Sequence, residues 1–286
     1  IAARCAWLAY HYPAEFFCAT LNSFIGKADK VQNFVVTCQK KGIPILPPDI
    51  NASDELFTVA ADNSIRYGLK GLRNISGVSE IVAERENGEF QNMQSFIERM
   101  VQRDSRKIDK RLMEALIFSS AMDCFPGTRN AKNSIAAAMI KNAVIEKTNT
   151  ENGQMTLFDG SFGDYSNITT IPIPDLPEYD KRFLLDKELE YSGFYITSHP
   201  LDEFPEILNN KKISYIASFI NQDGEDQETS NSVQGKDEVK VFAIMEEYKV
   251  KRTKENKPYV TFVAKDKSGE IKCIAFSECV NKCFGE

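Results

Sequence analysis

The chain has 286 residues, of which 42% are hydrophobic and 27% charged, and a formal net charge of −6 at pH 7. This composition excludes a disordered chain and is sufficient for a substantial core in about two domains or more. No apolar run reaches the roughly 18 residues of a membrane span, and the seven cysteines and two histidines lack zinc-site spacing. We therefore expect a soluble, cytoplasmic protein with reduced thiols and no membrane partner.

The net charge is an average over unlike segments. Residues 99–111 carry six basic and two acidic side chains, a local charge of +4, and residues 249–257 are also basic. Residues 151–206 carry twelve acidic and three basic side chains. Two basic segments thus flank an acidic connector, and basic segments are suited to binding nucleic acid.

The first part of the chain shows helical periodicity. Residues 2–24 predict a helical hairpin in which Pro13 begins the second helix. Residues 27–41 predict another helix with one apolar face. Residues 43–51 contain three prolines and are expected to be extended, and residues 57–67 predict a short β-hairpin.

The middle of the chain is predicted to be helical and then irregular. Residues 68–147 predict short helices joined by tight turns, with Thr128 as an N-cap. Residues 151–177 are rich in Gly and Pro without periodicity, which indicates a linker or a wrapped arm. Residues 178–191 predict a helix, and residues 221–237 are acidic, polar and expected to be disordered.

Residues 239–276 are rich in β-forming side chains. Three such runs, at residues 241–244, 259–263 and 271–276, are separated by polar turns, as in the first half of a five-stranded OB-type barrel. The chain ends at Glu286 before the remaining strands, so we expect an incomplete barrel. The predicted fold class is α+β multidomain, mostly helical and followed by a partial, OB-like β-barrel.

No segment carries the convergent residues of an active site. Residues 198–203 place His199 beside two acids, but the following proline favours a capped, solvated turn. The chain has no Gly-x-x-x-x-Gly-Lys phosphate loop. We therefore expect no catalytic residue, no metal site and no cofactor in this chain.

Residues 69–85 resemble a helix-hairpin-helix unit, in which a tight turn presents backbone N–H groups to a DNA phosphate. Asn74-Ile75-Ser76 stands where such units have Gly-apolar-Gly, and the alternative is a purely structural hairpin. A second unit is predicted at residues 96–118 around a basic turn, whose alternative is a solvated charged turn. Two such units would bind duplex phosphates without reading sequence. The predicted DNA-binding residues are Lys70, Arg73, Asn74, Ser76, Gly77, Arg103, Arg106, Lys107 and Lys110.

Residues 154–158 form a second motif, within the polar connector. They read Gln154, Met155, Thr156, Leu157 and Phe158, and peptides of the form Gln-x-x-Leu-Phe are what bacterial sliding clamps bind. The Leu and Phe side chains would each gain roughly 1.5–3 kcal/mol on burial in an apolar pocket. The alternative is that Leu157 and Phe158 dock onto their own domain.

A basic segment leads into the first loop of the predicted barrel. It contains Lys249, Lys251, Arg252 and Lys254, with Tyr248 and Tyr259 nearby. Basic side chains and aromatic faces suit single-stranded nucleic acid, by phosphate neutralisation and base stacking. A solvated barrel edge is the alternative.

Four stretches, in this order, resemble the α (catalytic) subunit of bacterial DNA polymerase III. They are residues 9–16 (Ala-Tyr-His-Tyr-Pro-Ala-Glu-Phe), 45–51 (Ile-Leu-Pro-Pro-Asp-Ile-Asn), 65–69 (Ile-Arg-Tyr-Gly-Leu) and 192–202 (Ser-Gly-Phe-Tyr-Ile-Thr-Ser-His-Pro-Leu-Asp). The resemblance implies four regions. These are the end of a fingers domain (1–64), a helix-hairpin-helix and clamp-binding domain (65–150), an acidic connector with the clamp-binding peptide and one helix (151–208), and an OB-like domain (209–286).

The resemblance also implies a function. The parent subunit would be a DNA-directed DNA polymerase that uses Mg²⁺, with its catalytic aspartates upstream of Ile1. This part, inactive alone, would tether the polymerase. Its implied partners are the sliding clamp (β subunit), duplex primer-template, single-stranded template and other replicase subunits. Two alternatives remain open, a free-standing nucleic-acid-binding scaffold or repair protein and a metal-dependent nuclease.

Overall fold

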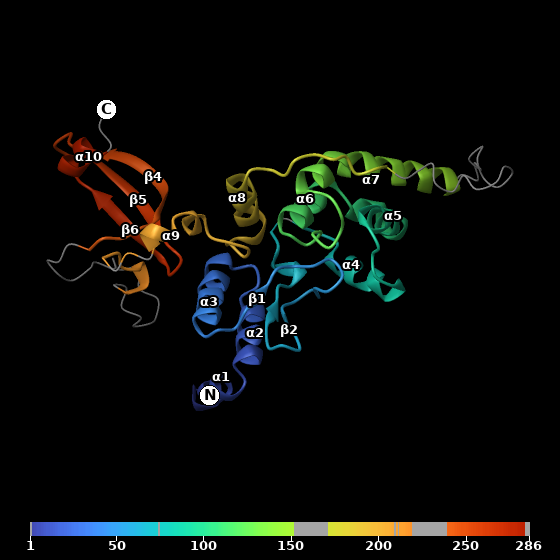
Figure 1. Ribbon diagram of the computed structural model, residues 1–286, viewed down its shortest axis with the longest axis horizontal. Coiled ribbons are helices and arrows are strands. Elements are labelled where there is room, and N and C mark those ends of the chain that lie inside the picture. The colour runs from blue at the N-terminus through green and yellow to red at the C-terminus, as the bar shows by residue number, and fades with distance from the viewer. Residues whose placement is uncertain are drawn as a thin grey trace. The chain divides into compact units, whose positions relative to one another are not determined.

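The computed structural model describes residues 2–73, 75–151, 171–208, 210, 212–218 and 239–283. The chain forms two compact units, residues 1–197 (unit 1) and residues 198–286 (unit 2) (Figure 1). Unit 1 is mostly helical, and the described part of unit 2 is built around a three-stranded sheet. The predicted α+β class is confirmed, although the strands described in unit 2 do not close into a barrel.

Unit 1 begins with the predicted helical hairpin. Helix α1 (Ala2–His11) is followed by α2 (Pro13–Ser23), whose first residue is the proline that was expected to start it. Helix α3 (Ala28–Lys40) buries one apolar face, including Val31 and Val35, as its periodicity predicts. Gly42 follows with a φ of 73°, in the left-handed region that favours glycine after a helix.

A small sheet follows, with strand order β1-β3-β2. Strands β2 (Thr58–Val59) and β3 (Ile65–Arg66) form the predicted antiparallel hairpin. Strand β1 (Ile45–Leu46) adds a parallel pairing that was not predicted. Prolines do not prevent it, because β1 is joined through acceptors: Pro44 O receives the N–H of Ile65 at 2.8 Å, and Leu46 O receives that of Tyr67 at 3.0 Å.

Two asparagines hold the loops around this sheet, because each side-chain amide makes the two hydrogen bonds that a neighbouring strand would make. The side-chain amide of Asn22 accepts from Phe57 N (2.8 Å) and donates to Phe57 O (2.9 Å). Asn51 makes the same two bonds to Phe90, both at 2.9 Å. These bonds satisfy backbone groups that are otherwise far from a strand partner, so the loops are fixed.

The helical middle contains α4 (Val78–Glu84), α5 (Met93–Asp104), α6 (Lys110–Phe118) and α7 (Arg129–Glu151), and α7 packs against α5 and α6 (Figure 1). The hydroxyl of Thr128 accepts from Ala131 N at 3.1 Å, so the predicted N-cap is confirmed. One continuous hydrophobic cluster includes residues from Ala14 to Phe194. The core of unit 1 therefore extends across the predicted boundary at residues 64–65.

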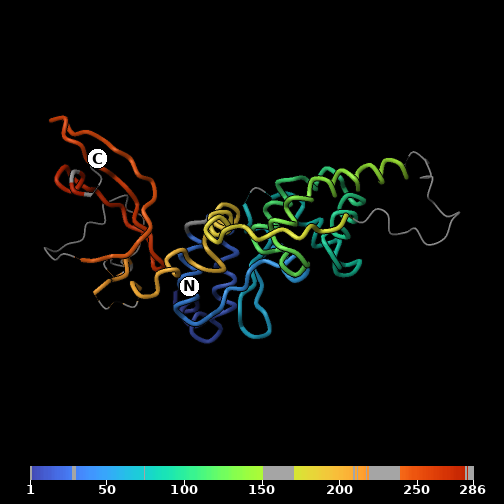
Figure 2. Tube along the Cα trace, turned by 45° about the horizontal axis from the view of Figure 1, so that its top comes forward, coloured from blue at the N-terminus to red at the C-terminus, as the bar shows by residue number. Residues whose placement is uncertain are grey.

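The described part of the acidic connector is a wrapped arm. Residues 171–180 run back along α7 to α8 (Lys181–Ser192) (Figure 2). The Glu178 carboxylate accepts from Arg129 N (2.9 Å) and Asn130 N (3.2 Å) at the start of α7, and Ile171 N donates to Gln94 Oε1 at 3.2 Å. Burial acts to raise the pKa of Glu178, but the backbone N–H donors of Arg129, Tyr179 and Asn130 outweigh it and lower the pKa.

The end of unit 1 is closed by a buried carboxylate. Glu188 on α8 accepts from Ile196 N, from Thr197 N (2.8 Å) and from the Thr197 hydroxyl (2.6 Å). The Tyr67 hydroxyl donates to Gly71 O (2.8 Å) and to Ser192 O (3.1 Å). These bonds tie the α8 end to the start of the helical middle.

Unit 2 begins with short helical turns, η4 (Pro200–Glu203) and α9 (Pro205–Leu208). His199 caps η4, because its Nδ1 accepts from Leu201 N at 3.2 Å while Asp202 accepts from His199 N at 2.8 Å. The predicted cap is confirmed, whereas Pro200 and Leu201 are buried, so the turn is not solvated throughout. Burial, followed by the Lys267 charge, lowers the pKa of His199.

The sheet of unit 2 has the antiparallel order β4-β5-β6, with β4 (Ile244–Arg252), β5 (Pro258–Lys265), β6 (Glu270–Ala275) and then α10 (Ser277–Cys283). Three strands were predicted, but the first was placed too early, at residues 241–244. Lys249, Lys251 and Arg252 consequently lie on β4 and lead into the β4–β5 turn, as the basic segment was expected to do. Cross-strand pairing with β5 outweighs the low β-propensity of Glu and Lys in this segment.

Candidate nucleic-acid interface

Two turns of unit 1 lie side by side. Turn A (residues 72–77) precedes α4, and turn B (residues 105–109) joins α5 to α6. Gly77 has a φ of 80°, and a Cβ there would lie 3.2 Å from Lys107 O and 3.3 Å from Lys107 Cβ. A residue without a side chain is therefore needed where turn A approaches turn B.

The segment in front of turn A differs from the predicted helix. Only η1 (Leu69–Gly71), a single 3-10 turn, precedes it. The backbone N–H groups of Leu69 and Lys70 donate to Asp54 O and Glu55 O, both at 2.9 Å, which satisfies donors that the start of a helix leaves free. The Lys70 ammonium pairs with the Glu55 carboxylate. The first helix-hairpin-helix unit thus has one turn where a full helix was expected.

Turn A is anchored through its backbone. Arg73 N donates to Tyr191 O at 2.7 Å, and the Tyr191 hydroxyl donates to Glu114 Oε2 on α6 at 3.2 Å. Burial, together with Glu114, raises the pKa of Tyr191 to about 12. The side chains of Arg73 and Ser76 are exposed, whereas Asn74 lies outside the described residues. Turn A is consequently fixed in position with an arginine facing solvent.

The second predicted unit is confirmed as helix, turn and helix. Asp109 caps α6 by accepting from Leu112 N at 2.8 Å, and Asp104 accepts from Arg106 N at 3.0 Å. Each predicted basic side chain of this unit pairs with an acid. The pairs are Arg103–Glu84 (3.2 Å), Arg106–Asp104 (3.0 Å), Lys107–Glu80 (3.4 Å) and Lys110–Glu114 (3.4 Å).

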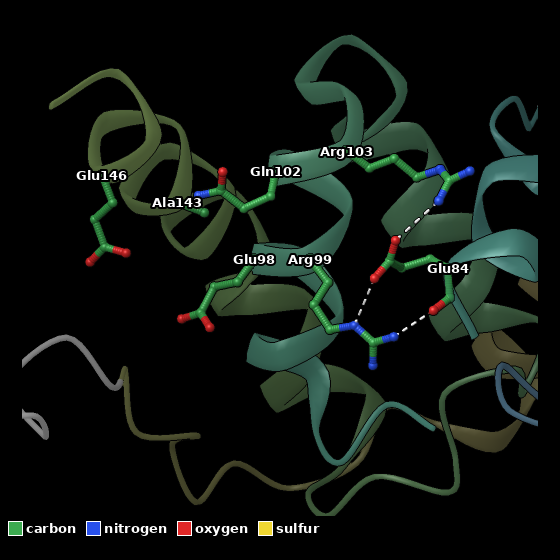
Figure 3. A pocket seen from close by; sticks show the side chains of 7 residues that line it. All are labelled: Glu84, Glu98, Arg99, Gln102, Arg103, Ala143 and Glu146. Carbon is green, nitrogen blue, oxygen red and sulfur yellow. Dashed lines mark hydrogen bonds and ion pairs between the residues drawn. The ribbon is translucent and has the colours of Figure 1, made fainter. Parts of the chain in front are cut away.

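Glu84 is the most buried of these acids and was not predicted. Its side chain is 11% exposed and receives Arg99 Nε at 3.0 Å as well as Arg103 (Figure 3). Burial acts to raise the pKa of Glu84, but hydrogen bonds from Asn87, Arg99 and Arg103 outweigh it and lower the pKa. The only sequence signal is the spacing of two arginines four residues apart, on one face of a helix.

The pocket in Figure 3 has a volume of about 410 Å³ and is also lined by α5 and α7. Glu98 and Glu146 both line it, and the pKa of Glu146 is raised by burial and by the Glu98 charge. The Arg99 guanidinium carbon lies 4.5 Å from the centre of the Phe90 ring, and Arg99 Nη1 donates to Gly88 O at 2.9 Å. Arg99 is therefore committed to holding α4, α5 and the 88–90 loop together.

A basic face lies on the sheet of unit 2. Lys249, Thr261 and Ile274 are paired across the three strands, and Val263 is paired with Lys272. With Lys251 these side chains line a shallow hollow of about 270 Å³. Lys272 was not predicted; its alternation with Ile271 and Cys273 in β6 was the available signal.

The other predicted basic residues of unit 2 lie at the hairpin turn. Arg252 donates to the Asn256 side chain at 3.0 Å, and Lys254 is exposed in the turn itself. The peptide from Gln154 to Phe158 lies outside the described residues. Its flanks are described, since α7 ends at Glu151 and Ile171 is bonded to Gln94.

In the described part of the chain, no three His, Cys, Asp or Glu side chains gather in an arrangement that could hold a metal ion. Among the same residues, no helix combines the length and the apolar character that crossing a membrane requires.

The comparisons with known proteins agree on one family. A family model described as a helix-hairpin-helix motif matches residues 42–132. The DNA polymerase III subunit alpha of Chlamydia pneumoniae is 32% identical over 220 residues, covering 76% of this chain and 17% of the relative. Those of Aquifex aeolicus (32% identical, 94% of this chain, 21% of the relative) and Bacillus subtilis (29%, 97% and 23%) match nearly the whole chain. The chain spans about a fifth of the length of these relatives.

Proposed function

The chain is homologous to one segment of the DNA polymerase III alpha subunit, as its sequence motifs predict, and from this premise we propose its function. It is the non-catalytic DNA- and clamp-binding region of a replicative polymerase subunit and supports processive synthesis. In this proposal the parent subunit is a cytoplasmic, Mg²⁺-dependent DNA polymerase that works with other replicase subunits.

The adjacency of turns A and B is the observation that carries the DNA-binding part of the proposal. Gly77 lets the two turns approach closely, and both lie within the residues matched by the helix-hairpin-helix model. Two adjacent turns with exposed basic side chains suit successive phosphates of a duplex. The contacts would position the protein on DNA without reading its sequence.

The clamp-binding part rests on the Gln-x-x-Leu-Phe motif at residues 154–158. Its flanks are attached to unit 1, at Glu151 on α7 and at Ile171 beside Gln94. A peptide tethered to a DNA-binding unit makes clamp binding and DNA binding intramolecular, so the combined affinity can exceed either contact by 10² or more. This linkage is the physical basis of the proposed processivity.

The basic sheet face of unit 2 is proposed to bind the single-stranded template. Lys249, Lys251 and Lys272 would neutralise phosphates, with Arg252 and Lys254 at the neighbouring turn. Tyr259 lies opposite Lys251 in the β4–β5 pairing and offers a ring for base stacking.

The experiment that tests the clamp-binding part compares two double variants of the full chain. Leu157→Ala with Phe158→Ala removes both side chains that would fill an apolar pocket, so we expect at least a tenfold higher Kd for a purified bacterial clamp. The matched control, Phe162→Ala with Ile168→Ala, changes two apolar residues of the same segment and is expected to stay within twofold. Equal affinities of the wild type and the first variant, measured by calorimetry, would overturn this role.

A further inference from the structure

The basic side chains around turns A and B fall into two groups. One group is paired with acids, Arg103 and Lys107 with those of α4 and Lys70, Arg106 and Lys110 with others, whereas Arg73 and Arg111 pair with no acid among the described residues. We infer that Arg73 and Arg111 supply the main side-chain contacts to duplex phosphates, and that Arg103 and Lys107 chiefly hold the turns in place. This inference rests on the proposed duplex binding and assigns it to particular residues, of which Arg111 was not predicted.

Arg103 is not available to a ligand without cost. Its partner Glu84 is buried, with 11% of the side chain exposed, and is shared with Arg99. A phosphate that drew Arg103 away would leave a buried carboxylate short of a partner, which is strongly unfavourable. Arg103 therefore acts as a positioning residue for α4 and α5.

Lys107 is committed in two ways. Its ammonium lies 3.4 Å from the Glu80 carboxylate, and its backbone and Cβ form the surface against which Gly77 packs. The ion pair is partly exposed and weak, so a phosphate can compete for it, but each such contact replaces an existing one. The net gain from Lys107 is consequently small.

Arg111 lies in the first turn of α6 and is exposed. It stays exposed although the neighbouring Leu112, Met113, Ala115 and Leu116 are buried. Lys110 pairs with Glu114, but in the described chain Arg111 pairs with neither carboxylate nor backbone oxygen. Its planar guanidinium can bind a phosphate with two parallel hydrogen bonds and has no intramolecular pair to give up.

Two hydrogen bonds of Tyr191 link the backbone of Arg73 to the helix that carries Arg111. Arg73 N is bonded to Tyr191 O, and the Tyr191 hydroxyl reaches Glu114, one helical turn from Arg111. The backbone at Arg73 is thus fixed while its side chain stays exposed. The two arginines lie on the two sides of the Tyr191 contact, Arg73 on turn A and Arg111 in the first turn of α6.

The test compares Arg111→Gln with Lys107→Gln, two variants that remove the same charge a few residues apart. With a fluorescent duplex at about 0.1 M salt we expect Arg111→Gln to bind about fivefold more weakly, and Lys107→Gln less than twofold more weakly. The slope of log K against log salt should fall by about 0.9 for Arg111→Gln, as for one lost phosphate contact. Arg73→Gln serves as a second variant with the same expectation, and thermal melting should be unchanged in each.

A further variant should change duplex binding in the opposite direction. Glu80→Gln frees Lys107 and should tighten duplex binding about two- to threefold, a gain that disappears when Lys107→Gln is added. The control, Glu86→Gln, removes the same charge from the next turn, where the described chain shows no ion pair. It should tighten duplex binding less than Glu80→Gln does. Equal losses for Arg111→Gln and Lys107→Gln would overturn the inference alone. Duplex binding by the wild type that is insensitive to salt would overturn the proposed function together with it.

Discussion

Units 1 and 2 are stabilised in different ways. Unit 1 has a continuous apolar cluster from Ala14 to Phe194, and its loops are closed by side chains that bond backbone groups. In the described part of unit 2, Val260 and Ala264 are buried on β5, but several apolar side chains on the sheet or directly after it are open to solvent. These are Met245 (47% exposed), Val250 (58%), Ile274 (56%) and Phe276 (65%).

The difference indicates that the more rigid unit carries the turns proposed to bind duplex DNA. The turns proposed to contact duplex phosphates lie on the packed unit, where a shift of the backbone would break several buried contacts. The basic sheet face lies on the unit that depends more on its β-ladder and less on side-chain packing. The same substitution should therefore lower the free energy of unfolding more in unit 1 than in unit 2. We also expect the two units to unfold in two separate transitions.

The largest expected difference comes from two glycines. A Cβ at Gly68 would lie 2.3 Å from Leu56 C and 2.5 Å from Phe57 N, both backbone atoms, so Gly68→Ala should destabilise unit 1 by about 3 kcal/mol or more. A Cβ at Gly269 in unit 2 would meet nothing within 4 Å, so Gly269→Ala should stay within about 0.5 kcal/mol. Urea unfolding followed by circular dichroism measures both, and equal costs would break the comparison.

An intermediate effect is expected from two fully buried valines. Val101 on α5 and Val260 on β5 are both 0% exposed, so Val→Ala removes the same atoms from each. We expect a loss of about 2–3 kcal/mol at Val101 and about 1 kcal/mol at Val260, because partly covered surroundings can collapse into the space. The free energies of the two unfolding transitions measure both losses. A larger loss for Val260→Ala than for Val101→Ala would contradict the view that unit 1 is the more tightly packed unit.

The smallest expected effect is on pH dependence. The pKa of His199 in unit 2 is lowered by burial and by Lys267, so the unfolded state binds more protons, and stability should fall as the pH drops through about 6.5. Glu84 in unit 1 also has a lowered pKa, but its stabilisation is lost only below the ordinary Glu value of about 4.3. Between pH 7 and 5 these groups should therefore weaken unit 2 alone.

The control for this prediction is His199→Asn, which keeps an acceptor for Leu201 N and cannot be protonated in this range. It should flatten the pH dependence of the unit 2 transition, as measured by thermal melting at a series of pH values. A wild-type unit 2 that melts at the same temperature at pH 7 and pH 5 would contradict the assignment.

Local features of the fold were predictable from the sequence, and long-range pairings were not. The periodicity of residues 27–41 and the cap at Thr128 depend on neighbours within a turn, and both are confirmed. Strand β1 has two residues between prolines, and its partner lies about twenty residues away, so no local pattern indicates it. The start of β4 was misjudged because pairing with β5, not β-propensity, decides it.

The candidate site shows the same division. The two turns were predicted from a motif, but the acids that pair with Arg103 and Lys107 come from α4, 19 and 27 positions earlier in the numbering. Residue type alone cannot distinguish a paired from an unpaired cation, so Arg111 was missed. Lys272 was missed because its face of the sheet is defined only by the register of three strands. The clamp peptide at residues 154–158 stays a prediction.

The bond from the Tyr67 hydroxyl to Ser192 O joins residues 125 positions apart. During synthesis at about 5–20 residues per second, roughly 6–25 s pass between the appearance of these two residues. Throughout that interval the ring of Tyr67 cannot pack against the ring of Phe194. In the folded unit the centres of these two rings are 5.8 Å apart. The apolar side chains around Tyr67 therefore stay exposed in the nascent chain during this interval, in which we expect chaperones to protect them.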